Sequence, residues 1–153
     1  MPESVWDYPR PPKVEDVIQP VKIKFNGQTI ADSLNVKRVL ERGHPPVYYF
    51  PLEDINSKVI QASTKKTWCE WKGEAKYFDV QSGDRISKNA AWFYPNPTQA
   101  FKEIKDYVAF YAGKMDACYV GDELVKPQAG DFYGGWITSN IEGPFKGSQK
   151  VRV

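Results

Sequence analysis

Hydrophobic and polar positions alternate along most of the chain, which is the pattern of strands whose two faces differ. The clearest case is Val21–Phe25, where apolar residues alternate with lysines before Asn26-Gly27 and a second apolar stretch. An Asn-Gly pair between two such runs is typical of a tight hairpin turn. Short apolar runs bounded by turn residues predict further strands over Val36–Leu40, Val47–Phe50, Val59–Ala62, Thr67–Lys72, Ala75–Val80 and Ala90–Tyr94.

Helical spacing of apolar residues occurs mainly in one place. Asn96-Pro97 resembles a helix cap followed by a first-turn proline, and the residues after it predict a short helix over about Thr98–Lys105. The stretch Tyr107–Tyr111 is rich in strand-forming residues and predicts a strand after that helix. A second hairpin is expected around Gly121-Asp122.

Composition supports a mainly β fold. The chain of 153 residues has 14 Val and 9 Ile against 4 Leu, together with 22 aromatic residues. β-Branched and aromatic side chains suit a pleated, half-buried surface. We therefore predict one compact antiparallel sheet with one short helix, built from residues 21–153 as a single domain.

Two segments are predicted to wrap this body. Residues 1–20 form a proline-rich arm that should be extended, and its Trp6 and Tyr8 should dock on the body because free tails rarely carry such side chains. Residues 126–147 form a C-terminal aromatic loop. Its stretch Gly130–Trp136 is too aromatic for a linker and too rich in glycine for a strand interior, which favours a packed loop where backbone passes close to another group.

Charge and cysteine content narrow the possible partners. The 21 basic and 19 acidic residues are interspersed, so the chain lacks the basic patch that duplex nucleic acid requires. Its longest apolar run, Tyr107–Ala112, is far shorter than a membrane span, and the N-terminus lacks the apolar run of a signal peptide. Cys69 and Cys118 are too far apart for a metal knuckle. We expect a cytoplasmic monomer or homodimer with no cofactor and no structural metal.

Several stretches together resemble a family of domains of unknown function, DUF427, which carries a nucleotidyltransferase-like label. The similarity covers almost the whole chain. The stretches that carry it are Val5–Pro11, His44–Pro46, Cys69–Gly73, Ala91-Trp92, Asp106–Tyr111, Gly130–Ser139 and Gly143–Gly147.

The resemblance implies a compact β fold of the tent-like, Mss4-like type. Relatives with that fold hold zinc through paired Cys-x-x-Cys knuckles, which this sequence lacks, and the family offers no established catalytic residues to transfer. Nucleotidyl transfer itself is the less favoured function. The chain has no Asp-x-Asp or Asp-x-Glu pair to hold Mg²⁺, and residues 143–148 lack the spacing of a phosphate-binding loop.

Candidate catalytic residues are few. His44 is the only histidine and hence the one side chain whose unperturbed pKa lies near neutrality, although a role in fixing a Pro-Pro turn is favoured over catalysis. Strand alternation would place Cys69 and Trp71 on one face and Trp68, Glu70 and Lys72 on the other. Glu70 and Lys72 could then transfer protons in a cleft, or form an exposed ion pair of little energetic consequence.

The abundance of aromatic residues predicts a small-molecule site on the concave face of the sheet, serving either binding alone or catalysis. We assign catalytic roles to His44, Glu70 and Lys72. The residues expected to contact the ligand are Cys69, Trp71, Trp92, Tyr94, Asp131 and Tyr133. The alternative is a non-enzymatic interaction module whose exposed aromatic residues bind a protein partner. The sequence leaves open whether the protein is an enzyme.

Overall fold

The computed structural model describes residues 2–128 and 133–146, and it confirms the mainly β prediction. Its largest element is a seven-stranded antiparallel sheet. In spatial order its strands are β2 (Lys13–Asp16), β5 (Lys37–Leu40), β6 (Val47–Phe50), β10 (Val108–Phe110), β9 (Arg85–Phe93), β8 (Gly73–Ser82) and β7 (Ile60–Cys69). A four-stranded sheet follows the order β12 (Glu123–Leu124), β11 (Ala117–Val120), β3 (Val21–Phe25) and β4 (Gln28–Ser33).

Short elements complete the fold. Two pairs of strands stand apart from the larger sheets: β1 (Glu3–Ser4) runs parallel to β15 (Ile141–Glu142), and β13 (Lys126–Pro127) runs antiparallel to β14 (Trp136–Ile137). Within the described part of the chain the helical turns are all of the 3₁₀ type, namely η1 (Val5–Asp7), η2 (Leu52–Asp54), η3 (Ser57–Val59), η4 (Gln99–Ile104) and η5 (Ala112–Lys114). The predicted short helix is η4, which is kinked at Phe101.

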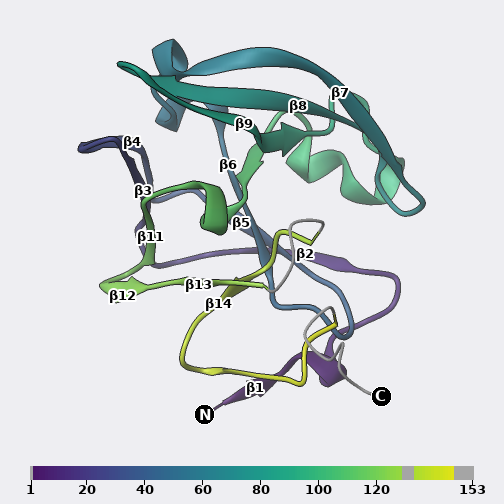
Figure 1. Cartoon of the computed structure of the whole chain (residues 1–153). Helices are drawn as coiled ribbons and strands as arrows, with labels where there is room; N and C mark the ends of the chain where they lie inside the picture. Colours follow the sequence, from purple (N-terminus) through teal and green to yellow (C-terminus); the bar gives the residue numbers. More distant parts are fainter. Residues whose placement is uncertain (1, 129–132, 147–153) are drawn as a thin grey trace, which may run out of the picture.

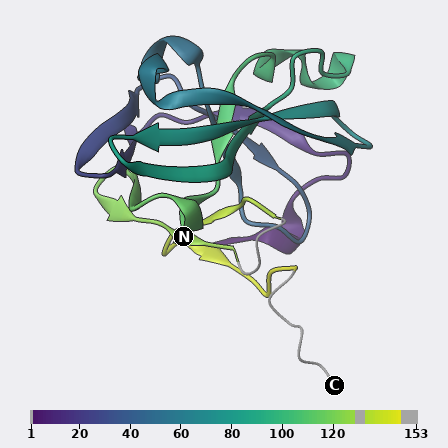
Figure 2. The ribbon, with the colours of Figure 1, turned by 45° about the horizontal axis from the view of Figure 1, so that its top comes forward.

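The three longest strands define one end of the molecule. Figure 1 shows β7, β8 and β9 arching over the rest of the chain, with β1 and β14 at the opposite end. In Figure 2, where the top of Figure 1 is turned forward, these strands run across the front of the molecule. The two strands predicted over 59–62 and 67–72 form a single strand, β7, in the structure. Its pairing with β8 is irregular between Ala62 and Lys66.

The central strands β6 and β10 of the large sheet bury side chains on both faces, and strand alternation decides which side chain lies on which face. Tyr48 and Phe50 belong to the main core with the residues of the four-stranded sheet, whereas Tyr49 between them belongs to a second buried cluster. On β10, Phe110 likewise belongs to the main core and Ala109 to the second cluster. The second cluster lies under η4 and is rich in aromatic side chains, so it provides the setting of the candidate site.

Both predicted hairpins are confirmed. Asn26 and Gly27 connect β3 to β4 with positive φ angles, as a tight primed turn requires. Gly121 and Asp122 connect β11 to β12. The main core between the two sheets contains 21 buried residues, and it includes Cys118, for which burial raises the pKa of the thiol.

The arm contacts the body through several elements. Tyr8 is buried with Val5, Leu40 and Ile141, while Trp6 is partly exposed and donates a hydrogen bond from Nε1 to the Pro144 carbonyl at 2.6 Å. The arm is less extended than expected, because Ser4 caps the 3₁₀ turn η1 by accepting from the Trp6 amide. Its strand β2 forms an edge of the seven-stranded sheet. Among the described residues, no helix has the length and apolar character needed to cross a membrane.

Candidate functional site

Aromatic side chains form a row across one face of the large sheet. The pairing register places Tyr49 of β6, Ala109 of β10, Trp92 of β9 and Tyr77 of β8 next to one another. Trp92 packs edge-on against Tyr49 and also contacts Tyr77 and Tyr111. Such neighbours on adjacent strands stabilise a sheet, and here they provide a rigid aromatic floor.

A cavity of about 250 Å³ lies on this floor. Six of the nine predicted site residues border it, namely His44, Cys69, Lys72, Trp92, Tyr94 and Tyr133. These residues come from four separate stretches of the chain that the fold brings together. Ligand sites are usually cavities of this kind, with apolar walls and a few convergent polar groups.

The prediction for the strand around Cys69 is wrong in one respect that matters for the site. β7 ends at Cys69, and Glu70, Trp71 and Lys72 form a turn before β8 begins at Gly73. Gly73 has a φ of 102°, a conformation that side chains other than glycine rarely adopt. Strand alternation therefore does not apply beyond Cys69, and Lys72 lies on the same side as Cys69 rather than on the opposite face.

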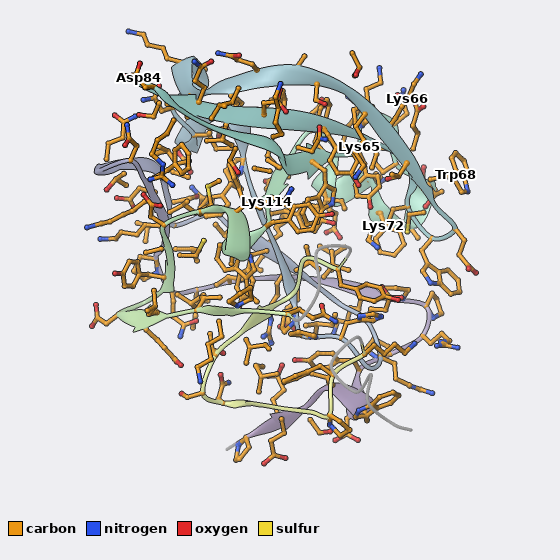
Figure 3. The ribbon with its side chains drawn as sticks, viewed as in Figure 1. Lys65, Lys66, Trp68, Lys72, Asp84 and Lys114 are labelled. Carbon is orange, nitrogen blue, oxygen red and sulfur yellow. The ribbon has the colours of Figure 1, made fainter. Side chains whose placement is uncertain are left out.

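Lys72 is buried at the end of the β7–β8 pair. Only 6% of its surface is exposed, and its Nζ lies 3.5 Å from the Cys69 Sγ and over the rings of Tyr94 and Phe101. Figure 3 shows Lys72 on the inner side of the arch, whereas Lys66 and Trp68 extend outward from β7. The predicted Glu70–Lys72 ion pair does not form, since Glu70 is exposed and Lys72 has no carboxylate within 4 Å among the described residues.

His44 borders the cavity from a tight loop. Its backbone amide donates to the Glu41 carbonyl, and Gly43 between them has a φ of 87°. The imidazole is buried, with its ring centroid 4.6 Å from that of Tyr133. Burial lowers the pKa of His44; the Glu41 carboxylate raises it, and Lys146 and Lys72 lower it further. The ring is therefore neutral at physiological pH.

Gln128 determines which imidazole nitrogen carries the proton. Its Oε1 accepts from the Gly135 amide at 3.2 Å, and its Nε2 donates to the Lys146 carbonyl at 2.7 Å, so the amide can be oriented only one way. The same Nε2 lies 3.3 Å from the His44 Nδ1. Nδ1 must then accept this hydrogen bond, which leaves the proton on Nε2. This arrangement favours His44 as a hydrogen-bond donor over the general base that the sequence suggests.

The glycines of the aromatic loop lie in close contact with the cavity wall. A Cβ on Gly134 would lie 2.1 Å from a ring carbon of Trp92, and one on Gly135 would lie 2.6 Å from the Pro45 carbonyl. Trp136 anchors the loop in the main core by donating from Nε1 to the Phe110 carbonyl at 3.0 Å. The close approach of backbone that the glycine content predicts is therefore present.

The remaining predicted residues lie elsewhere. Glu70 is exposed on the turn and does not border the cavity, and Trp71 packs half-buried beside the second cluster. Asp131 lies outside the described residues. The sequence reasoning missed Glu41 and Gln128, as well as Thr67, Tyr49, Tyr77 and Tyr111, which also border the cavity. Strand alternation could have identified Tyr49 and Tyr77, because both share a face with Trp92.

The chemistry available in the cavity is mainly hydrogen-bond donation. Burial raises the pKa values of Tyr49 and Tyr94, so both phenols keep their protons. His44 Nε2 and the Lys72 ammonium are further donors, and Glu41 is the only carboxylate that borders the cavity among the described residues. Nowhere in residues 2–128 and 133–146 do three His, Cys, Asp or Glu side chains come close enough to hold a metal ion.

Fold and cavity together define a mainly β protein with an aromatic-walled cavity on one face of its large sheet. The chain belongs to the family described as a domain of unknown function (DUF427), whose model matches residues 13–121, more than half of the chain. The predicted family is thereby confirmed. The matched stretch includes most of the cavity wall but ends before Gln128 and Tyr133. No curated protein matches the chain.

Proposed function

We propose that this protein binds a small organic molecule in the aromatic cavity. The observation that carries the proposal is convergence: strands β5 to β9, the His44 loop, Gln128 and Tyr133 all contribute side chains to one cavity. Its volume of about 250 Å³ lies just below the range of about 300–1,000 Å³ that drug-sized ligands occupy, so the ligand is smaller than a typical drug.

The polar groups support binding better than they support a particular reaction. His44 donates from Nε2, the buried tyrosines keep their protons, and Glu70 lies outside the cavity. A general base within reach of a ligand would have to be Glu41, which no motif identifies. Catalysis by His44 and Lys72 remains a prediction. It can be tested only once a ligand has been identified.

Nucleotidyl transfer and protein interaction have weaker support. A nucleoside triphosphate would bring several negative charges to a cavity bordered by one lysine, and it exceeds the cavity in size. An interaction module would use a patch of exposed aromatic residues, but Trp92 and Tyr94 are buried. Of the described aromatic side chains, only Trp6, Trp68 and Tyr133 are exposed. A tent-like relationship to zinc-knuckle proteins likewise stays a proposal that rests on the sequence resemblance.

A screen of metabolites and nucleotides by thermal shift tests the proposal. A ligand of the cavity should stabilise the wild type, because binding to the folded state alone raises the melting temperature. Val47→Phe should abolish that shift, since Val47 borders the cavity and phenylalanine would fill it. Val14→Phe is the matched control, because Val14 is also half-buried against the second cluster but lies outside the cavity.

The outcomes separate the alternatives. A compound that shifts the wild type and Val14→Phe but not Val47→Phe supports the proposal. A compound that shifts all three equally binds elsewhere. If no compound produces a shift, the interaction module becomes the better explanation.

A further inference from the structure

The cavity contains two opposite charges that do not neutralise each other. Glu41 and Lys72 both border it, and neither forms an ion pair within 4 Å with another described residue. Cavity lysines are commonly held by a carboxylate, because a buried charge without a counter-charge is costly. Here each charge remains available to a ligand.

Lys72 is the better defined of the two. Its ammonium is buried, and the groups around it are a thiol 3.5 Å away and the faces of two aromatic rings 5.6 and 5.9 Å away. Ring faces attract a cation but supply no negative charge to neutralise it. A carboxylate that entered the cavity would meet an ammonium already held in position.

Glu41 acts on the same space. Burial has the largest effect on two neighbouring groups, lowering the pKa of His44 and raising that of Tyr49, and the Glu41 carboxylate raises the pKa of both. Glu41 borders the cavity and is half-buried, so it is less enclosed than Lys72. Glu41 makes no side-chain hydrogen bond with another described residue.

From these two unpaired charges and the aromatic floor between strands, we propose that the ligand is a small zwitterion with a flat apolar body, of the class of aromatic amino acids. Its carboxylate would bind Lys72, with His44 Nε2 as a further donor, and its ammonium would bind Glu41. Its ring would pack on the floor formed by Tyr49, Tyr77 and Trp92. This inference rests on the proposed small-molecule function and specifies its ligand.

A matched set of probes tests the charge requirement. L-Phenylalanine carries both charges, 3-phenylpropionate only the carboxylate, and 2-phenylethylamine only the ammonium. Isothermal titration calorimetry on the full chain should show each single-charge probe binding about tenfold or more weakly than phenylalanine, because charge-assisted hydrogen bonds are the strong ones.

Two variants assign the charges to residues. Lys72→Met keeps the length of the side chain, and it should make phenylalanine bind no better than 2-phenylethylamine. Glu41→Gln should make phenylalanine bind no better than 3-phenylpropionate. Lys114→Met and Glu103→Gln are the controls and should keep the wild-type preference. Lys114 also lies over a tyrosine ring, and Glu103 is exposed on η4, but neither borders the cavity.

The results distinguish this inference from the proposed function. If phenylalanine and 3-phenylpropionate bind wild type equally, or if none of the three probes binds, the zwitterion class is wrong. The proposed function survives either result as long as another compound gives a thermal shift that Val47→Phe abolishes. If Val47→Phe abolishes no shift, both the function and the class fail.

Discussion

Replacement of Gln128 by methionine should both destabilise the fold and release the tautomer of His44. Methionine keeps the length of the side chain and removes its hydrogen bonds to the His44 Nδ1, the Lys146 carbonyl and the Gly135 amide. Gln128 is 3% exposed, so water cannot readily replace these partners. Each such bond contributes about 0.5–1.5 kcal/mol net, which gives a loss of roughly 2–4 kcal/mol for the three together.

The melting temperature should fall accordingly. For a chain of this length, 1 kcal/mol corresponds to roughly 2–4 °C, so the expected decrease is roughly 4–16 °C. Gln61→Met is the matched control, because Gln61 makes one exposed hydrogen bond to Gln81 and should change the melting temperature little. Differential scanning calorimetry measures both variants.

Nitrogen NMR of the single histidine measures the second effect. In the wild type the two ring nitrogens should show the pattern of a neutral ring protonated at Nε2, and in Gln128→Met they should move toward a mixture of tautomers. A wild-type ring protonated at Nδ1, or a Gln128→Met variant that melts with the wild type, would refute the hydrogen-bond network inferred for the site.

Three further predictions concern the N-terminal arm, the pH dependence of stability and the role of metal. Deletion of residues 1–12 should lower the melting temperature, because it exposes the cluster that Val5 and Tyr8 complete, each contributing about 1.5–3 kcal/mol; an unchanged melting temperature would show that the arm is dispensable for stability. Because the folded-state pKa of His44 is depressed, the unfolded chain takes up a proton first as the pH falls, so stability present above about pH 6.5 should decline below it. In His44→Gln that decline should shrink in chemical denaturation at about pH 7.5 and 5.5, and equal declines would contradict it. Treatment with EDTA should leave the melting temperature unchanged, and stoichiometric zinc in protein purified without added metal would count against this prediction.

Local patterns were sufficient to predict most of the strands. Alternation identifies β3, because Val21, Ile23 and Phe25 are buried and the lysines between them are more exposed. A short apolar run identifies β6, and the turn residues Asn26-Gly27 and Gly121-Asp122 mark their own hairpins. The division into two sheets was not predictable in the same way. Which strands pair depends on contacts between segments far apart in the chain, such as β3 with β11.

The position of Lys72 shows where local patterns fail. Alternation assumes that the strand continues, but β7 ends three residues earlier than predicted. Lys72 was therefore assigned to the face opposite Cys69, whereas it lies on the same side. The signal for the earlier end was present in Gly73, whose positive φ suits the close of a turn. Local sequence offers no other signal that would place the turn at 70–72.

Long-range partners account for the residues that were missed. Gln128 and His44 are 84 positions apart, and nothing near either residue indicates the other. Glu41 is only three residues from His44, but it is a site residue only because the loop that holds both residues faces the cavity. His44 was predicted correctly as a residue of the cavity because it is the only histidine in the chain. The residues that contact it could be identified only from the three-dimensional structure.

The unpaired charges at an otherwise aromatic cavity are the strongest general argument for a ligand. A second core that served stability alone could fill the space above Trp92 with aliphatic side chains and would have no reason to hold Glu41 and Lys72 apart. Gly134 and Gly135 instead let backbone pack directly against the cavity wall, which keeps the loop close without filling the space. The unpaired, buried ammonium of Lys72 reduces the stability of the empty protein, and a ligand carboxylate would restore it. The structure therefore leads us to expect a large thermal shift on binding, relative to the small size of the ligand.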